Sequence, residues 1–318
     1  MGSLVFVVGA GASSEFDLPT GERLKSHIAD TLWVNREPFQ LFRDNIFNKL
    51  ARKLRSEQMT EESIVQAANL IRKSMGGAPS IDNFVHTHRN RPEVEMVAKI
   101  AIAKCILEAE RKSKLYVPDD NIHNELDLTN LTKTWLLELF KVLAQQGDFL
   151  SFLDRLSKIY FISFNYDRCI HQFFWFASRT YFKLTDEEAM RVVERLNVEY
   201  PYGTVGELRY DAACGTGFGS VDEQQVYQSA LNLRTFTEGC ASDFPEKVQA
   251  IFSSARRVYF LGFGFLPLNM EILLGASPYE VEGVYGTAKG LPAMQLAEVK
   301  QDLAPHFVRQ VFATGHVT

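Results

Sequence analysis

Leu4-Val5-Phe6-Val7-Val8-Gly9-Ala10-Gly11-Ala12-Ser13 stands near the start of the chain and decides its fold. Its five consecutive apolar residues, mostly β-branched or aromatic, predict a strand that is buried on both faces. Gly9 and Gly11 permit a tight turn into a helix, whose first N–H groups and dipole favour an anion such as a nucleotide phosphate. Ser14 stands where the dinucleotide fingerprint has its third glycine, so the sequence argues against an ordinary dehydrogenase. A tight turn that binds nothing is the alternative.

Three later segments repeat the strand signal. Residues 159–164 are followed by Asn165-Tyr166-Asp167, residues 198–200 lead into Tyr202-Gly203-Thr204, and residues 258–261 end in Gly262-Phe263-Gly264. Helical material separates these segments, which predicts an α/β fold with a Rossmann-like parallel sheet. The loops should converge at the carboxyl ends of the strands, where such sheets bind ligands.

The helical pattern suggests how the chain is divided. We expect one domain over residues 1–318, with an α/β nucleotide-binding core formed by 1–35 and 151–318. Residues 36–150 carry apolar residues at helical spacing and predict a mainly helical insertion. Helices are also expected at 22–32, at 171–176 and from Asp243 to about residue 255.

Composition narrows the classes of function. The 318 residues carry a net charge of −5, which gives no electrostatic reason to expect nucleic-acid binding. The four cysteines are scattered, so neither a disulfide framework nor a zinc site is predicted, and no metal is expected. No apolar run approaches the roughly 20 residues that cross a bilayer. The apolar start is short and lacks a basic leader, so we expect a cytoplasmic protein without membrane contact.

Five motifs follow one another along the chain: Gly9-Ala10-Gly11-Ala12-Ser13, Phe16-Asp17-Leu18-Pro19, Asn165-Tyr166-Asp167, Tyr202-Gly203-Thr204 and Gly262-Phe263-Gly264. In this order they resemble the motifs of the sirtuin superfamily. The chain is most similar to the sirtuin-like domains of bacterial anti-phage defence systems, which degrade NAD. This resemblance implies an NAD hydrolase that depletes NAD when a partner or its own assembly triggers it. It also implies a homo-oligomer, or a partner protein such as an ATPase or an Argonaute-like protein.

The resemblance assigns roles to particular residues. The first turn would hold the NAD pyrophosphate through the amides of Gly11, Ala12 and Ser13, and Asn165 would contact the nicotinamide ribose and the attacking water. The cofactor-binding candidates are Gly9, Ala10, Gly11, Ala12, Ser13, Asp82, Asn165, Asp167, Gly203, Gly262, Gly264 and Asn269. The candidates for catalysis are Asn165, Tyr202 and His171. Asp82, Asp167 and Asn269 have an alternative explanation as helix caps or loop braces.

Two departures from the family leave the activity open. Sirtuins carry a histidine base immediately before the glycine that corresponds to Gly203, and this chain has Tyr202, a poor base at neutral pH. His171, His86 or His88 would have to substitute for that base. The zinc module is missing, which argues against protein deacetylation. The alternative function is an NAD-binding or NAD-derivative-binding subunit that signals to a partner or acts as a scaffold; a nucleotide-processing enzyme outside this family is a third possibility.

Overall fold

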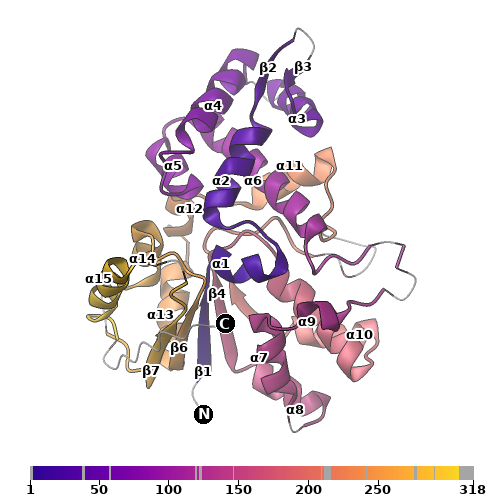
Figure 1. Ribbon diagram of the computed structural model, residues 1–318, viewed down its shortest axis with the longest axis vertical. Coiled ribbons are helices and arrows are strands. Elements are labelled where there is room, and N and C mark those ends of the chain that lie inside the picture. Colours follow the sequence, from indigo (N-terminus) through magenta and orange to yellow (C-terminus); the bar gives the residue numbers. More distant parts are fainter. Residues whose placement is uncertain are drawn as a thin grey trace.

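The computed structural model describes residues 3–37, 40–56, 59–118, 120–121, 124–145, 147–208, 210, 216–240, 242–275, 278–289 and 291–307 (Figure 1). Five strands form a parallel sheet in the order β5-β4-β1-β6-β7, which confirms the predicted Rossmann-like α/β class. These strands are β1 (Ser3–Val8), β4 (Ile159–Ser163), β5 (Asn197–Glu199), β6 (Ala255–Leu261) and β7 (Gly283–Gly286).

Strand β1 is central because its side chains are apolar on both faces. Val5 and Val7 join one buried cluster, whereas Phe6 and Val8 join the other. This alternation follows from the two-residue period of a strand. Phe6 pairs in register with Phe161 of β4 and with Tyr259 of β6. In the same register Val8, the last residue of β1, lies beside Ser163 and Leu261, so the three strands end side by side.

Helices cover both faces of the sheet. One face carries α13 (Phe244–Ser254), α14 (Pro267–Leu273) and α15 (Ala293–Leu303), and the other carries α7 (Trp135–Ala144), α8 (Phe149–Leu156), α9 (Cys169–Phe182) and α10 (Asp186–Val193). The helix predicted behind Asp243 is α13, with proline in its first turn. The short helix predicted at 171–176 is part of the longer α9.

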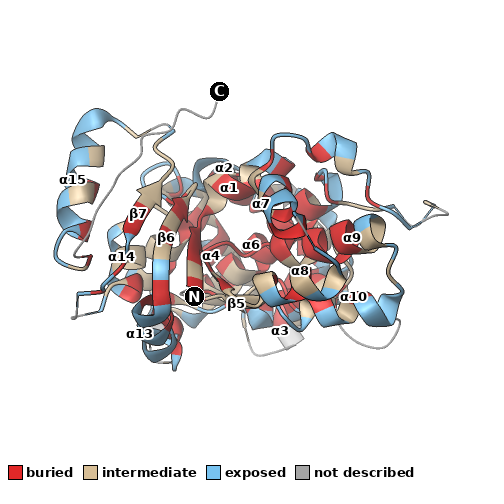
Figure 2. Cartoon of the chain, turned by 90° about the horizontal axis from the view of Figure 1, so that it is seen from below, coloured by how far each residue is buried: buried red, intermediate tan, exposed pale blue. Residues whose placement is uncertain are grey.

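A lobe of helices stands above the carboxyl edge of the sheet (Figure 1). Its members are α2 (Gly21–Thr31), α3 (Asn45–Ser56), α4 (Glu61–Ser74), α5 (Ile81–Thr87), α6 (Pro92–Lys112), α11 (Glu223–Asn232) and α12 (Phe236–Cys240). Helix α6 runs through the middle and is mostly buried, while α13 and α15 are largely exposed at the outside (Figure 2).

The helical lobe does not coincide with the segment 36–150, and the division into 1–35, 36–150 and 151–318 stays a prediction. The described residues of 36–150 are mainly helical, but the antiparallel pair β2 (Val34–Glu37) and β3 (Gln40–Phe42) was not predicted. Helix α7 lies in this range and nevertheless packs on the sheet, where Trp135 stacks on Phe6 of β1 with ring centroids 6.2 Å apart. Helix α11 lies outside the range and packs on α6. Hydrophobic packing, rather than chain order, therefore decides which helices form the lobe.

No helix within the described ranges is long and apolar enough to cross a membrane.

Candidate active site

The candidate site lies at the carboxyl ends of β4, β1 and β6. Strand β1 leads into α1 (Ala10–Ser13), β4 leads into the loop 164–168, and β6 leads into the loop 262–266. These loops meet because their strands are neighbours in the sheet. The sheet thus brings together three of the motifs that the sequence placed far apart.

The two glycine turns pack directly against each other. Gly262 has a φ of +55°, and a Cβ at this position would lie 2.0 Å from the Ala12 nitrogen. A Cβ on Gly9 would lie 2.5 Å from the Gly262 carbonyl oxygen, and one on Gly11 would lie 2.8 Å from the Gly262 Cα. No side chain fits in such a contact, so packing between the two turns accounts for glycine at these three positions.

The first turn does not present all the amides that the sequence suggested for a phosphate. The Gly11 amide donates to the Gly262 carbonyl at 3.0 Å, and the Ala12 amide donates to the Gly9 carbonyl at 3.0 Å. Two of the three expected phosphate donors are thus already paired within the protein. The Gly11 and Ala12 amides are therefore not open to a pyrophosphate in this structure, because the second turn supplies the acceptor for Gly11 and Gly9 supplies the one for Ala12. Binding of a pyrophosphate by Gly11, Ala12 and Ser13 stays a prediction.

Asn165 is fixed against the first turn. Its side-chain nitrogen Nδ2 donates to the Gly9 carbonyl at 3.0 Å and to Ser13 Oγ at 2.8 Å, and the residue is 6% exposed. A carbonyl oxygen can only accept, so the contact with Gly9 determines which end of the carboxamide is the nitrogen. Asn165 Oδ1 has no hydrogen-bond partner within the described residues and remains able to accept a hydrogen bond.

Asp167 stabilises the start of α9. Its Oδ1 accepts from the Cys169 amide at 3.1 Å, which agrees with the structural alternative derived from the sequence. Burial raises the pKa of Asp167, while hydrogen bonds from Cys169 and Ser13 act in the opposite direction. Ser13 therefore interacts with the side chains of both Asn165 and Asp167.

Asp82 and Tyr166 connect the helical lobe to this segment. The Tyr166 hydroxyl donates to Asp82 Oδ1, and the Tyr166 carbonyl accepts from the Val205 amide at 3.1 Å. Burial raises the pKa of Asp82, with the Tyr166 hydrogen bond opposing it. The N-cap of α5 is Ser80, whose Oγ accepts from Asn83, so Asp82 is not the helix cap.

Tyr202 is buried and has a structural partner. It is 1% exposed, and its hydroxyl donates to Asn269 Oδ1 at 2.8 Å. Asn269 lies inside α14, whose N-cap is Leu266, so it is not a helix cap either. The next residue, Gly203, has a φ of +67°, and a Cβ there would lie 2.3 Å from the Asn232 carbonyl oxygen. The hydroxyl of Tyr202 therefore supports the loop and is not a free base.

His171 faces Tyr200. Its Nδ1 lies 3.2 Å from the Tyr200 hydroxyl, and the two rings stack with centroids 6.0 Å apart. Burial, and to a smaller extent the charge of Arg168, lowers the pKa of His171 to about 4. The imidazole is consequently neutral at pH 7. His86 packs edge-on against Phe236, and His88 Nδ1 lies 2.9 Å from the Phe84 carbonyl oxygen.

His171 should make the stability of the protein depend on pH. Between pH 6.5 and about 4 the unfolded chain protonates this imidazole and the folded protein does not, so the free energy of unfolding should fall as the pH decreases. In His171→Gln the free energy of unfolding should fall less between pH 6.5 and about 4 than in the wild type, by up to about 3 kcal/mol. Urea unfolding across this pH range measures the difference. His27→Gln, at an exposed position of α2, is the matched control. Equal pH dependence in the two variants would contradict the prediction.

Gly264 differs from the other glycines. It is exposed, and a Cβ there would meet only the Leu266 side chain, at an ordinary 3.9 Å. Packing therefore does not require glycine at this position.

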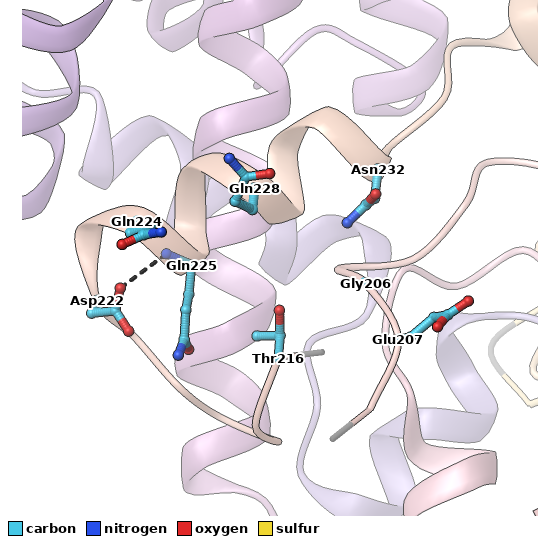
Figure 3. Close-up of a pocket in the computed structure, with 8 residues that line it drawn as sticks. All are labelled: Gly206, Glu207, Thr216, Asp222, Gln224, Gln225, Gln228 and Asn232. Atoms are coloured by element: carbon cyan, nitrogen blue, oxygen red, sulfur yellow. Dashed lines mark hydrogen bonds between the residues drawn. The ribbon is translucent and has the colours of Figure 1, made fainter. Parts of the chain in front are cut away.

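The structure also contains features that the sequence analysis missed. Glu110 and Arg168 form a buried ion pair behind the site, with 0% and 2% of their side chains exposed. The available signals were a charged residue near the end of the apolar helix α6, at position 110, and another at position 168, between Asp167 and Cys169. A pocket of about 580 Å³ lies between the segment Gly206–Glu207, Thr216 and α11 (Figure 3). Its described lining residues include none of the sequence candidates.

No group of three or more His, Cys, Asp or Glu side chains within the described ranges is arranged to hold a metal ion. Comparison with models of known protein families and with curated proteins gives no match to this chain.

Proposed function

We propose that the protein is an NAD hydrolase that breaks the nicotinamide–ribose bond and depletes NAD in bacterial anti-phage defence. The observation that carries the proposal is the contact of Asn165 with Gly9 and Ser13, which joins two motifs of the resemblance at the ligand-binding edge of a Rossmann-like sheet. A homo-oligomer or a partner protein, such as an ATPase or an Argonaute-like protein, would trigger the reaction.

The chemistry needs few groups from the protein. The C1′–N bond breaks with its electron pair going to the nicotinamide nitrogen, so the leaving group departs neutral. A water oxygen then bonds to C1′, and its proton passes to the solvent. Asn165 Oδ1 would orient that water or a ribose hydroxyl, because its nitrogen is held by Gly9 and Ser13. No base with a pKa near 7 is essential for the departure of a neutral leaving group.

A phosphate-binding conformation would require the first turn to part from Gly262 and also to change its own internal hydrogen bond from Ala12 to Gly9. The Gly11 and Ala12 amides are paired with carbonyl groups here, and an incoming pyrophosphate would have to replace these acceptors. Such a rearrangement is compatible with an enzyme that is silent until a partner or assembly changes its conformation.

A second candidate function is an NAD-binding or NAD-derivative-binding subunit without catalysis. It is favoured by the burial of Tyr202 and by the low pKa of His171, because neither residue supplies a base with a pKa near 7. The two functions predict different results with the same reagents.

The test is to incubate the purified chain with NAD and to measure free nicotinamide by chromatography and NAD binding by calorimetry. The assays are repeated with the protein concentrated and with candidate partners added. Release of nicotinamide supports the hydrolase. Binding of NAD without release of nicotinamide under all these conditions supports the second function. If NAD neither binds nor is cleaved, both proposed functions are contradicted.

Tyr202→Phe should have a small effect on activity and a measurable effect on stability. Loss of the hydrogen bond to Asn269 should reduce the free energy of unfolding by about 1 kcal/mol, while turnover should fall by less than about tenfold. Tyr202→His should not raise turnover, since the side chain is buried. Urea unfolding and nicotinamide release measure the two effects. A complete loss of turnover in Tyr202→Phe, with NAD still bound, would show that the phenol is essential.

A further inference from the structure

A second pocket, of about 380 Å³, lies between the carboxyl end of α6, the segment 116–117, α9 and the loop 217–222. Its volume is within the range of small-molecule sites. The described residues that line it include a cation, Arg111, a carboxylate, Asp222, and the carboxamide of Gln172. The pocket therefore presents groups that pair with charges of both signs.

The ion pair of Glu110 and Arg168 fixes the loop that forms one wall of this pocket. Arg168 Nη2 donates to the Gly217 carbonyl at 3.1 Å. Glu110 Oε2 accepts from the Gly219 amide, also at 3.1 Å. A Cβ on Gly219 would lie 2.6 Å from Arg111 Cα, so the loop packs directly on the end of α6. Such preorganisation lowers the entropic cost of binding.

Arg111 and Asp222 carry opposite charges that no ion pair within the described part of the chain uses. Arg111 is exposed in the last turn of α6. Asp222 is the N-cap of α11, where its Oδ1 accepts from the Gln225 amide at 2.9 Å (Figure 3). The two side chains line the same pocket without pairing with each other. A ligand that carries both an anionic and a cationic group can pair with both of them.

Gln172 adds an acceptor inside the pocket. The residue is 6% exposed, and its Nε2 donates to the Leu115 carbonyl at 3.1 Å, which determines the orientation of the carboxamide. Oε1 has no hydrogen-bond partner among the described residues and is not sealed from solvent, so a ligand in the pocket can donate to it. Phe176 and Phe218 also line the pocket and offer apolar contact to a flat ring.

We propose that this pocket binds a free α-amino acid with an aromatic side chain. The carboxylate of the ligand pairs with the Arg111 guanidinium, and its ammonium group donates to Asp222 and Gln172. Its ring packs against Phe176 and Phe218. The proposal does not depend on NAD hydrolysis, since none of the described residues that line this pocket belongs to the candidate active site.

The test is a calorimetric titration of the full chain with L-phenylalanine, without NAD. Parallel titrations use 3-phenylpropionate, which lacks the ammonium group, and phenethylamine, which lacks the carboxylate. We expect saturable binding of L-phenylalanine at millimolar concentration. Each analogue loses one charged hydrogen-bonding group and should bind at least about fivefold more weakly.

Two variants test the charged residues of the pocket. Arg111→Met and Asp222→Asn should each weaken the binding of L-phenylalanine by at least about fivefold. Both should unfold over the same range of urea concentration as the wild type, because Arg111 is exposed and asparagine is as good an N-cap as aspartate. Lys112→Met removes an exposed cation beside Arg111 that is not among the lining residues, so it is the matched control and should bind like the wild type.

Three results would overturn the proposal. They are an absence of saturable L-phenylalanine binding, unchanged affinity in Arg111→Met or Asp222→Asn, and binding of either analogue as tight as that of L-phenylalanine.

Discussion

Asn165→Ala should lower the rate of NAD cleavage by at least about 100-fold. The carboxamide is held by the Gly9 carbonyl and by Ser13 Oγ, and the substitution removes the oxygen that would orient the attacking water. The measurement is nicotinamide release at saturating NAD, with NAD affinity determined separately by calorimetry. We expect a loss in turnover that exceeds any loss in affinity.

The same substitution should also cost stability, because it removes two buried hydrogen bonds. We expect the free energy of unfolding to fall by about 1–3 kcal/mol. Asn197→Ala is the matched control, since Asn197 Nδ2 also donates to two backbone acceptors, the Ser157 and Ile159 carbonyls, both at 3.1 Å. These acceptors lie at the amino end of β4, away from the site. Loss of turnover in both variants would mean that reduced stability, and not the position of Asn165, causes the defect.

Glu110→Ala should produce the largest loss of stability that the structure indicates. Glu110 Oε1 accepts from the Arg168 amide and Nε, and Oε2 accepts from Arg168 Nη2 and from the Gly219 amide. Removing the carboxylate leaves the buried guanidinium charge without its partner. We expect the free energy of unfolding to fall by about 3–5 kcal/mol in urea.

Two further variants test whether the loss of stability in Glu110→Ala comes from the buried, unpaired Arg168 charge or would follow from the loss of an ion pair anywhere in the protein. Glu138→Ala removes the exposed pair with Lys141 and should cost less than about 1 kcal/mol. In the double variant Glu110→Leu with Arg168→Met, no charge remains buried, so part of the lost stability should return. A cost below about 1 kcal/mol for Glu110→Ala would show that water or another group compensates the Arg168 charge.

The sequence predicted the strands β1, β4, β5 and β6 and their parallel sheet, but it predicted neither β7 nor the order of the strands in the sheet. The apolar run of β1 and its two-residue alternation suffice to bury a strand on both faces, and the turns after β4 and β6 mark the edge where loops meet. Local patterns of this kind depend only on neighbouring residues. The assignment of α7 to the sheet and of α11 to the lobe depends on contacts between distant segments, which periodicity does not contain.

For the candidate site, the sequence determined which segments converge, and the tertiary structure decided what their side chains do. The proximity of Asn165 to the first turn could be predicted from neighbouring parallel strands. The pairing of Tyr202 with Asn269 and of Asp82 with Tyr166 could not, because each joins residues from separate elements. The glycines predicted a site for phosphate, but in the fold the backbones of the two glycine turns pack against each other. A glycine has no Cβ atom, and this allows close approach of another backbone segment as readily as of a ligand. The sequence alone does not distinguish the two.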